Sequence, residues 1–134
     1  MRLLSLEVTN YRNIASAMIV KSLELDFFRN YVHLEAVFDP RVNLIYGDNA
    51  QGKTNLLEAI WLLTGGKSFR GGKDAELVRR GEPFAVLEAS TLRAQQEEQE
   101  PDEPNRVRLT VGTPDSQRPG RYASVNGAAP RRAA

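Results

Sequence analysis

The sequence predicts an α/β fold, and three consecutive features support this prediction. Residues 42–46 form a nearly continuous apolar run, which is typical of a buried strand. A loop follows at residues 47–54, with glycines at positions 47 and 52. After this loop the apolar period becomes that of a helix, with one apolar face made of Leu56, Leu57, Ile60 and Leu63. A strand, a loop and a helix in this order form a basic unit of α/β proteins.

Further elements are predicted on both sides of this unit. Alternating or mainly apolar segments predict strands at residues 4–8, 32–38, 84–92, 106–111 and 121–125. Residues 74–80 fit a short helix, and Gly65-Gly66 would end the longer one, because glycine accepts a left-handed C-cap. Asn126-Gly127 favours a type I′ turn, which suits a hairpin.

The loop at residues 47–54 reads Gly-Asp-Asn-Ala-Gln-Gly-Lys-Thr and matches the phosphate-loop pattern in full. Gly52 lets the backbone approach a phosphate, and the loop N–H groups with the following helix N-terminus form an anion site. Lys53 is expected to contact the β- and γ-phosphates of ATP, and Thr54 to give its hydroxyl to Mg²⁺. The predicted nucleotide-binding residues are Gly47, Asp48, Asn49, Ala50, Gln51, Gly52, Lys53 and Thr54.

Composition sets limits on the other functions. The 134 residues include 18 Lys and Arg, 17 Asp and Glu, one His and no Cys, with a net charge of +1. A balanced charge gives no overall electrostatic preference for nucleic acid. The lack of cysteine excludes disulfides and thiolate zinc sites. No apolar run approaches the roughly 20 residues of a membrane-spanning helix. We therefore expect a cytoplasmic protein with no membrane partner.

The apolar residues divide the chain into unequal parts. Residues 1–92 contain 36 large apolar side chains and residues 93–134 only five, so the core must come from the first part. Residues 5–14 also share five of ten residues with residues 22–31. This repeat is either two similar strands or a duplicated translation start. We expect an extra segment at 1–18, an ATPase core at 19–92, and a polar loop with hairpin strands at 93–134.

Other candidate sites have weaker support. Residues 84–88 resemble a Walker B strand ending in an acid, and residues 63–66 resemble an ABC signature motif. A half-buried strand and a helix C-cap explain them better. His33 is the only histidine, so the sequence gives almost no support for a metal site or a catalytic triad there.

A glycine-rich loop carries a local basic patch. Lys67, Arg70 and Lys73 lie there beside Phe69, and this combination suits contacts with a DNA backbone. An ordinary solvated loop is the alternative interpretation.

Three further motifs give the chain a resemblance to the RecF family of bacterial DNA replication and repair proteins. These are Phe-Arg-Asn-Tyr at 28–31, Asn-Leu-Leu-Glu-Ala-Ile at 55–60 and Lys-Ser-Phe-Arg at 67–70, beside the phosphate loop. The resemblance runs from about residue 20 to the end and is weak between 93 and 120. It implies an ABC-type, SMC-like ATPase head, lobe I only, with a mixed sheet around the phosphate-loop helix and added antiparallel strands.

The resemblance also implies a function. Such proteins dimerise around ATP, bind single-stranded and linear double-stranded DNA, and work with RecO and RecR to load RecA in repair and the SOS response. Family members are longer than this chain, and their Walker B, signature, Q-loop and D-loop motifs lie downstream. We therefore expect an N-terminal part that binds ATP and Mg²⁺ without hydrolysing ATP. The alternatives are another SMC-like ATPase fragment, a small P-loop phosphotransferase, or a non-catalytic DNA- or partner-binding module.

Overall fold

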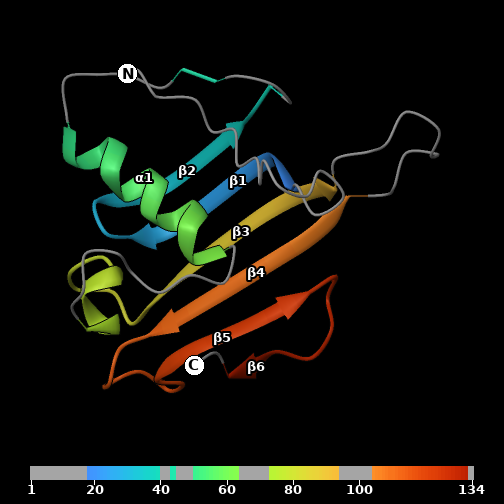
Figure 1. Ribbon diagram of the computed structural model, residues 1–134. Helices are drawn as coiled ribbons and strands as arrows, with labels where there is room; N and C mark the ends of the chain where they lie inside the picture. The colour runs from blue at the N-terminus through green and yellow to red at the C-terminus, as the bar shows by residue number, and fades with distance from the viewer. Residues whose placement is uncertain (1–17, 40–42, 45–49, 64–72, 94–103, 133–134) are drawn as a thin grey trace.

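The computed structural model describes residues 18–39, 43–44, 50–63, 73–93 and 104–132. Within these ranges one six-stranded sheet packs against one long helix (Figure 1). The elements are β1 (Met18–Phe28), β2 (Tyr31–Val37), α1 (Ala50–Leu63), the 3₁₀ turn η2 (Asp74–Leu77), β3 (Phe84–Arg93), β4 (Asn105–Gly112), β5 (Gly120–Val125) and β6 (Arg131–Arg132).

The sheet has the strand order β2-β1-β3-β4-β5-β6, and all of its described pairings are antiparallel. Strands β1 and β2 form a hairpin, and so do β4 and β5. The family resemblance implies a mixed sheet, and the sequence predicts a buried strand at residues 42–46. Of these only Asn43 and Leu44 are described; neither lies in a strand, and Leu44 is 71% exposed. These two residues therefore do not confirm the predicted buried strand.

Alternation along the strands gives the sheet two chemically different faces. The inner face, covered by α1, carries the buried core of Leu23, Leu25, Leu87, Leu109 and Val111. The outer face carries the residues between them in sequence, which are mostly polar or charged. Because side chains alternate with a period of two, each strand supplies residues to both faces.

Helix α1 buries the face that its sequence predicts. Leu56, Ile60 and Leu63 are buried and Leu57 is partly buried against the core, while Trp61 is about half exposed. The helix begins inside the phosphate-loop motif, at Ala50. The sheet therefore fixes the position of the predicted anion site through the apolar face of α1.

The other element predictions have mixed outcomes. The strands at 32–38, 84–92, 106–111 and 121–125 are confirmed within a residue or two. The Asn126-Gly127 turn is also confirmed: both residues have positive φ, and the Ala128 N–H donates to the Val125 carbonyl over 3.1 Å. The strand at 4–8, the repeat copy at 5–14 and the Gly65-Gly66 stop lie outside the described residues.

The predicted helix at 74–80 is wrong beyond its first turn. Only Asp74–Leu77 is helical, as a 3₁₀ turn, and Val78 is extended. The reason is tertiary, since Val78 forms a β-bridge with Phe28 at the end of β1. The Arg79 N–H completes this contact by donating to the Phe27 carbonyl over 2.7 Å.

Within the described ranges, no helix is long and apolar enough to cross a membrane.

Candidate nucleotide site

The phosphate-loop motif ends in the first turn of α1. Gly52 is buried there, and Lys53 and Thr54 are partly buried. The first N–H groups of a helix have no carbonyl partner within it, and the helix dipole adds positive potential at this end. The described half of the motif therefore has the backbone arrangement that an anion requires. Gly47, Asp48 and Asn49 lie outside the described residues.

The turn between β1 and β2 holds α1 through three consecutive side chains. Arg29 contacts Glu58, Asn30 contacts Asn55, and Tyr31 contacts Gly52. The helix partners are spaced by three residues, so they lie on one side of α1, about one turn apart. The three turn residues therefore follow this polar side of the helix back to the phosphate loop.

The Arg29–Glu58 pair is the buried anchor of this contact. Arg29 Nε lies 2.5 Å from Glu58 Oε1, and Nη2 lies 3.0 Å from Oε2, which is a bidentate arrangement. The Glu58 side chain is fully buried, and Arg29 is mostly buried. A carboxylate removed from water needs such a partner, because an unpaired buried charge is strongly destabilising. Glu58 is therefore assigned to positioning α1.

Tyr31 contacts the phosphate loop itself. Its hydroxyl donates to the Gly52 carbonyl over 2.6 Å. Burial raises the pKa of the Tyr31 phenol above its usual value, so the hydroxyl keeps its proton and remains a donor. This hydrogen bond fixes the backbone at the glycine that must face a phosphate.

The segment after η2 holds the turn in place from the other side. The Arg29 N–H donates to the Leu77 carbonyl over 2.9 Å, and Arg79 Nη1 donates to the Asn30 carbonyl over 2.9 Å. Phe27 and Arg29 both have positive φ, which is unfavourable for residues with large side chains. These bonds from a distant segment stabilise the turn conformation that aims residues 29–31 at α1.

A cavity of about 510 Å³ lies beside this contact. Its lining residues are Arg29, Asn30, Asn55, Ala75, Glu76, Val78 and Arg80. Asn55 is 3% exposed, and its Oδ1 is buried with no hydrogen-bond partner, while its Nδ2 donates to Asn30 Oδ1. A buried acceptor without a donor is costly, so the contact between Asn55 and Asn30 carries an energetic penalty.

The other sequence-predicted residues lie either outside the described residues or away from the first turn of α1. Lys67 and Arg70 lie outside the described residues, and Lys73 is exposed before η2. Residues 64–66 of the signature-like segment also lie outside. Glu88 points away from α1, since its neighbours Leu87 and Ala89 face the core, and it pairs with Arg106 over 2.9 Å. The structure therefore gives no support for Glu88 as a Walker B acid.

Sequence reasoning did not predict the contacts between the turn and the helix. One signal was present: Asn55 and Glu58, three residues apart, are the only polar residues of the helical segment 55–63. Polar residues at such positions are buried only where partners exist. Their partners come from a turn more than 20 residues earlier, and this proximity is visible only in the fold.

Comparison with known proteins supports the same assignment. The model of the RecF/RecN/SMC N-terminal domain matches residues 19–129. The DNA replication and repair protein RecF of Lachnospira eligens is 53% identical over 76 residues, which are 57% of this chain and 21% of that protein. RecF of Bacillus subtilis is 46% identical over 76 residues, 57% of this chain and 20% of that protein. The chain thus spans about a fifth of the length of these relatives.

Solved structures show the same fold. A structure of the recombination mediator protein RecF with ATP, in the RecFOR pathway, has a TM-score of 0.70 and 34% identity. It matches 89% of this chain, which covers 29% of that protein. An SMC ATPase structure matches 87% of this chain with a TM-score of 0.63; at 24% identity it supports the fold alone. The predicted ATPase-head fold is confirmed, and the chain belongs to the RecF/RecN/SMC N-terminal domain family.

Proposed function

We propose that residues 47–54 bind the phosphates of ATP, and that this chain is the ATP-binding part of a RecF-like DNA repair protein. One observation carries the proposal: α1 begins inside the phosphate-loop motif, and Tyr31 holds the Gly52 carbonyl at its first turn. The N-terminal end of a helix favours an anion, because the helix dipole gives it positive potential. The RecF structure solved with ATP has the same fold and supports the proposal by similarity.

The residues present fit a nucleotide with Mg²⁺. The cavity beside α1 offers Arg80 as a cation. Lys53 is proposed to hold the β- and γ-phosphates, and Thr54 to give its hydroxyl to Mg²⁺. Bound Mg²⁺ would neutralise phosphate charge and orient the oxygens.

We propose that the chain binds ATP without hydrolysing it. Turnover requires a group that positions the attacking water. In the described part of the chain, Glu58 is buried against Arg29 and Glu88 lies on the far sheet face, so neither carboxylate is placed to position that water. Residues 84–88 therefore do not act as a Walker B strand in this proposal, and the chain is proposed to bind ATP without turnover.

The activities of the whole protein are proposed from the relatives. They are named for DNA replication and repair, and one solved neighbour is placed in the RecFOR pathway. We infer that the parent protein binds DNA, dimerises with ATP, and acts with RecO and RecR to load RecA in the cytoplasm. Lys67, Arg70 and Lys73 remain the proposed DNA contacts, because cations beside an aromatic suit a phosphodiester backbone.

A titration with a fluorescent ATP analogue and Mg²⁺ tests the nucleotide site. Lys53→Ala removes a charge-assisted contact to phosphate worth about 1.5–3 kcal/mol, so affinity should fall roughly 10- to 100-fold. Lys21→Ala, an exposed cation on β1, is the matched control and should bind as the unmodified chain does. Equal binding by Lys53→Ala and the unmodified chain would overturn the assignment.

A further inference from the structure

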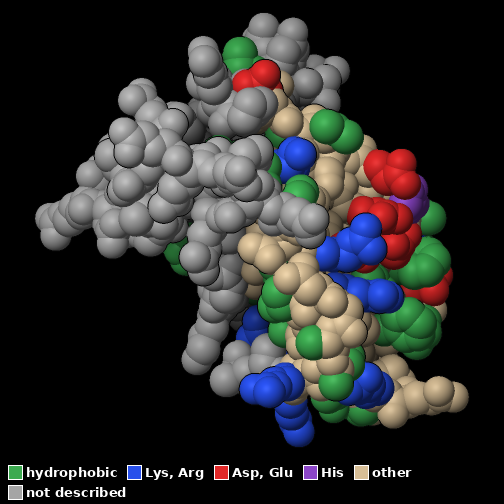
Figure 2. Space-filling view, turned by 90° about the vertical axis from the view of Figure 1, so that its right-hand side faces the viewer, with side chains coloured by type: hydrophobic (Ala, Val, Ile, Leu, Met, Phe, Trp, Pro, Cys, Tyr) green, Lys and Arg blue, Asp and Glu red, His purple; other side chains and the backbone are tan. Residues whose placement is uncertain are grey.

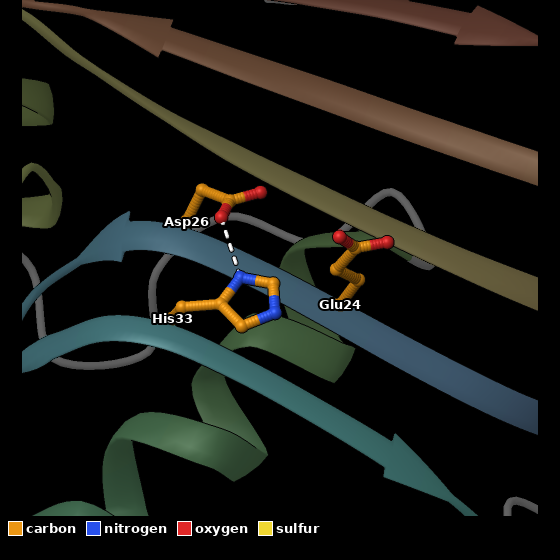
Figure 3. Close-up of side chains that lie close together, drawn as sticks. All are labelled: Glu24, Asp26 and His33. Atoms are coloured by element: carbon orange, nitrogen blue, oxygen red, sulfur yellow. Dashed lines mark hydrogen bonds and ion pairs between the residues drawn. The ribbon is translucent and has the colours of Figure 1, made fainter.

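The outer face of the β1–β2 hairpin brings together one imidazole and three carboxylates. In the strand register, Asp26 lies opposite His33, and Glu24 lies opposite Glu35. One potential ligand atom from each of Glu24, Asp26 and His33 lies within 4.8 Å of the others. Figure 3 shows the His33 ring beside the Asp26 and Glu24 side chains, which extend from the same side of β1. The four residues form a compact group of nitrogen and oxygen donors.

Both ring nitrogens of His33 face carboxylates. Nδ1 lies 2.7 Å from Asp26 Oδ1, and Nε2 lies 3.4 Å from Glu35 Oε1. The hydrogen bond to Asp26 is the main cause of a raised pKa for His33, and Glu35 adds to it. The side chains of His33 and Asp26 are 46% and 39% exposed, so an ion can reach them from solvent.

The negative charge in this group is poorly compensated. Glu24 lies opposite Glu35 on one side and opposite Glu88 on the other, and like charges in such positions destabilise a sheet. Glu88 is neutralised by Arg106. Glu24 makes no hydrogen bond or ion pair with the rest of the described chain. An added cation would relieve this repulsion.

We propose that Glu24, Asp26 and His33 bind a divalent transition-metal ion, for which Zn²⁺ is the natural probe. Carboxylates alone would suit Mg²⁺ or Ca²⁺, but an imidazole nitrogen favours Zn²⁺ and its neighbours. Tetrahedral Zn²⁺ with ligand distances near 2.0–2.2 Å places its donor atoms about 3.3 Å apart. The potential ligand atoms of Glu24, Asp26 and His33 now lie within 4.8 Å of one another, so these side chains would have to move closer together around the ion.

This site is separate from the proposed ATP–Mg²⁺ site. Glu24 and Asp26 alternate with the buried Leu23 and Leu25, so they lie on the sheet face away from α1. Figure 2 shows the histidine with acidic side chains around it on this part of the surface. The ion would join the adjacent strands β1 and β2 and stabilise the folded state, because the unfolded chain does not hold the three ligands together.

The sequence itself supplies a clean test. His33 is the only histidine, and the chain has no cysteine, so no other nitrogen or sulfur side chain favoured by Zn²⁺ competes. Zn²⁺ is titrated into the full chain without an affinity tag, at mildly alkaline pH where imidazole is neutral. Calorimetry should report one site, and the NMR signals of the single imidazole should shift.

Two variants then identify the ligands. His33→Gln and Glu24→Gln should each weaken Zn²⁺ binding at least tenfold, and Asp115→Asn, an exposed acid in a turn, should leave it unchanged. Because all three positions are exposed or partly exposed, the variants should keep the fold, which a melting curve with and without Zn²⁺ checks. Equal Zn²⁺ affinity in His33→Gln and the unmodified chain, or imidazole signals that do not respond, would overturn the proposal. Either result leaves the ATP proposal untouched.

Discussion

The turn and the outer face of the same β1–β2 hairpin carry polar groups of opposite character. At the turn, Arg29 and Glu58 are buried and joined by a bidentate pair. On the outer face, Glu24 of β1 and Glu35 of β2 are opposed in register, and His33 of β2 lies beside Glu35. Both groups come from residues 24–35 and their partners, so the difference reflects environment more than sequence.

This difference indicates what each group can do. Inside the protein, a charge persists only with a partner, so a buried and paired charge such as Arg29–Glu58 fixes geometry and has little capacity for a ligand. At the surface, water stabilises unpaired carboxylates, so charges can remain uncompensated and attract an ion. The turn network is therefore expected to position the phosphate loop, and the outer group to bind.

Breaking the buried pair should give the largest effect. Arg29→Ala leaves the Glu58 carboxylate buried without its guanidinium, and this should lower the free energy of unfolding by about 3–5 kcal/mol. Urea denaturation followed by circular dichroism measures the change. The matched surface variant Arg106→Ala breaks the exposed pair with Glu88 and should cost at most about 1 kcal/mol.

A double variant sharpens this comparison. Arg29→Met with Glu58→Leu removes both charges and keeps apolar volume, so it should recover most of the stability lost in Arg29→Ala. If Arg29→Ala and Arg106→Ala cost the same, the buried pair does not hold α1 in the way that its geometry indicates.

Much of the fold follows from the sequence because its signals are local. The helix face at Leu56, Ile60 and Leu63 and the strand alternation at 32–38 and 84–92 depend on near neighbours only. The failure at 74–80 has a non-local cause: the β-bridge between Val78 and Phe28 outweighs the helical preference of that short segment.

The sequence predicts which kind of site this is, a phosphate loop, but it does not predict the contacts that hold the loop in place. The pattern at 47–54 predicts a phosphate loop because each fixed residue has a local role. The contacts of residues 29–31 with α1 depend on long-range packing, and periodicity carries no information on it. The same reason explains why His33 gave no metal prediction: its carboxylate neighbours Glu24 and Asp26 come from another strand.

Tyr31→Phe should have an intermediate effect on the network at the turn. The change deletes the hydroxyl that donates to the Gly52 carbonyl and keeps the ring, so stability should fall by about 1 kcal/mol. ATP affinity should also weaken, because the first turn of α1 loses a restraint. Urea denaturation and nucleotide titration of the same sample measure both effects.

The pH dependence of Tyr31 has a definite sign. Its pKa is raised in the folded chain, so the stability linked to its proton is fully present below the unfolded value of 10.0. This stability is lost as pH rises through the higher folded pKa. Tyr31→Phe should remove this alkaline loss, seen as a smaller fall in unfolding free energy above pH 10. An unchanged alkaline profile would assign the loss to other groups.

The smallest effect should come from the outer face and have the opposite sign. In metal-free solution, Glu24→Gln removes the carboxylate that lies between Glu35 and Glu88, so the unfolding free energy should rise by about 0.2–1 kcal/mol. The gain should shrink in high salt, which screens exposed charges. Asp115→Asn, which has no such neighbours in the sheet, should change stability by less. With Zn²⁺ present the order should reverse, because the ion stabilises only a chain that keeps its ligands. A loss of stability in metal-free Glu24→Gln would show that Glu24 has a favourable contact, and it would remove the electrostatic reason for a cation there.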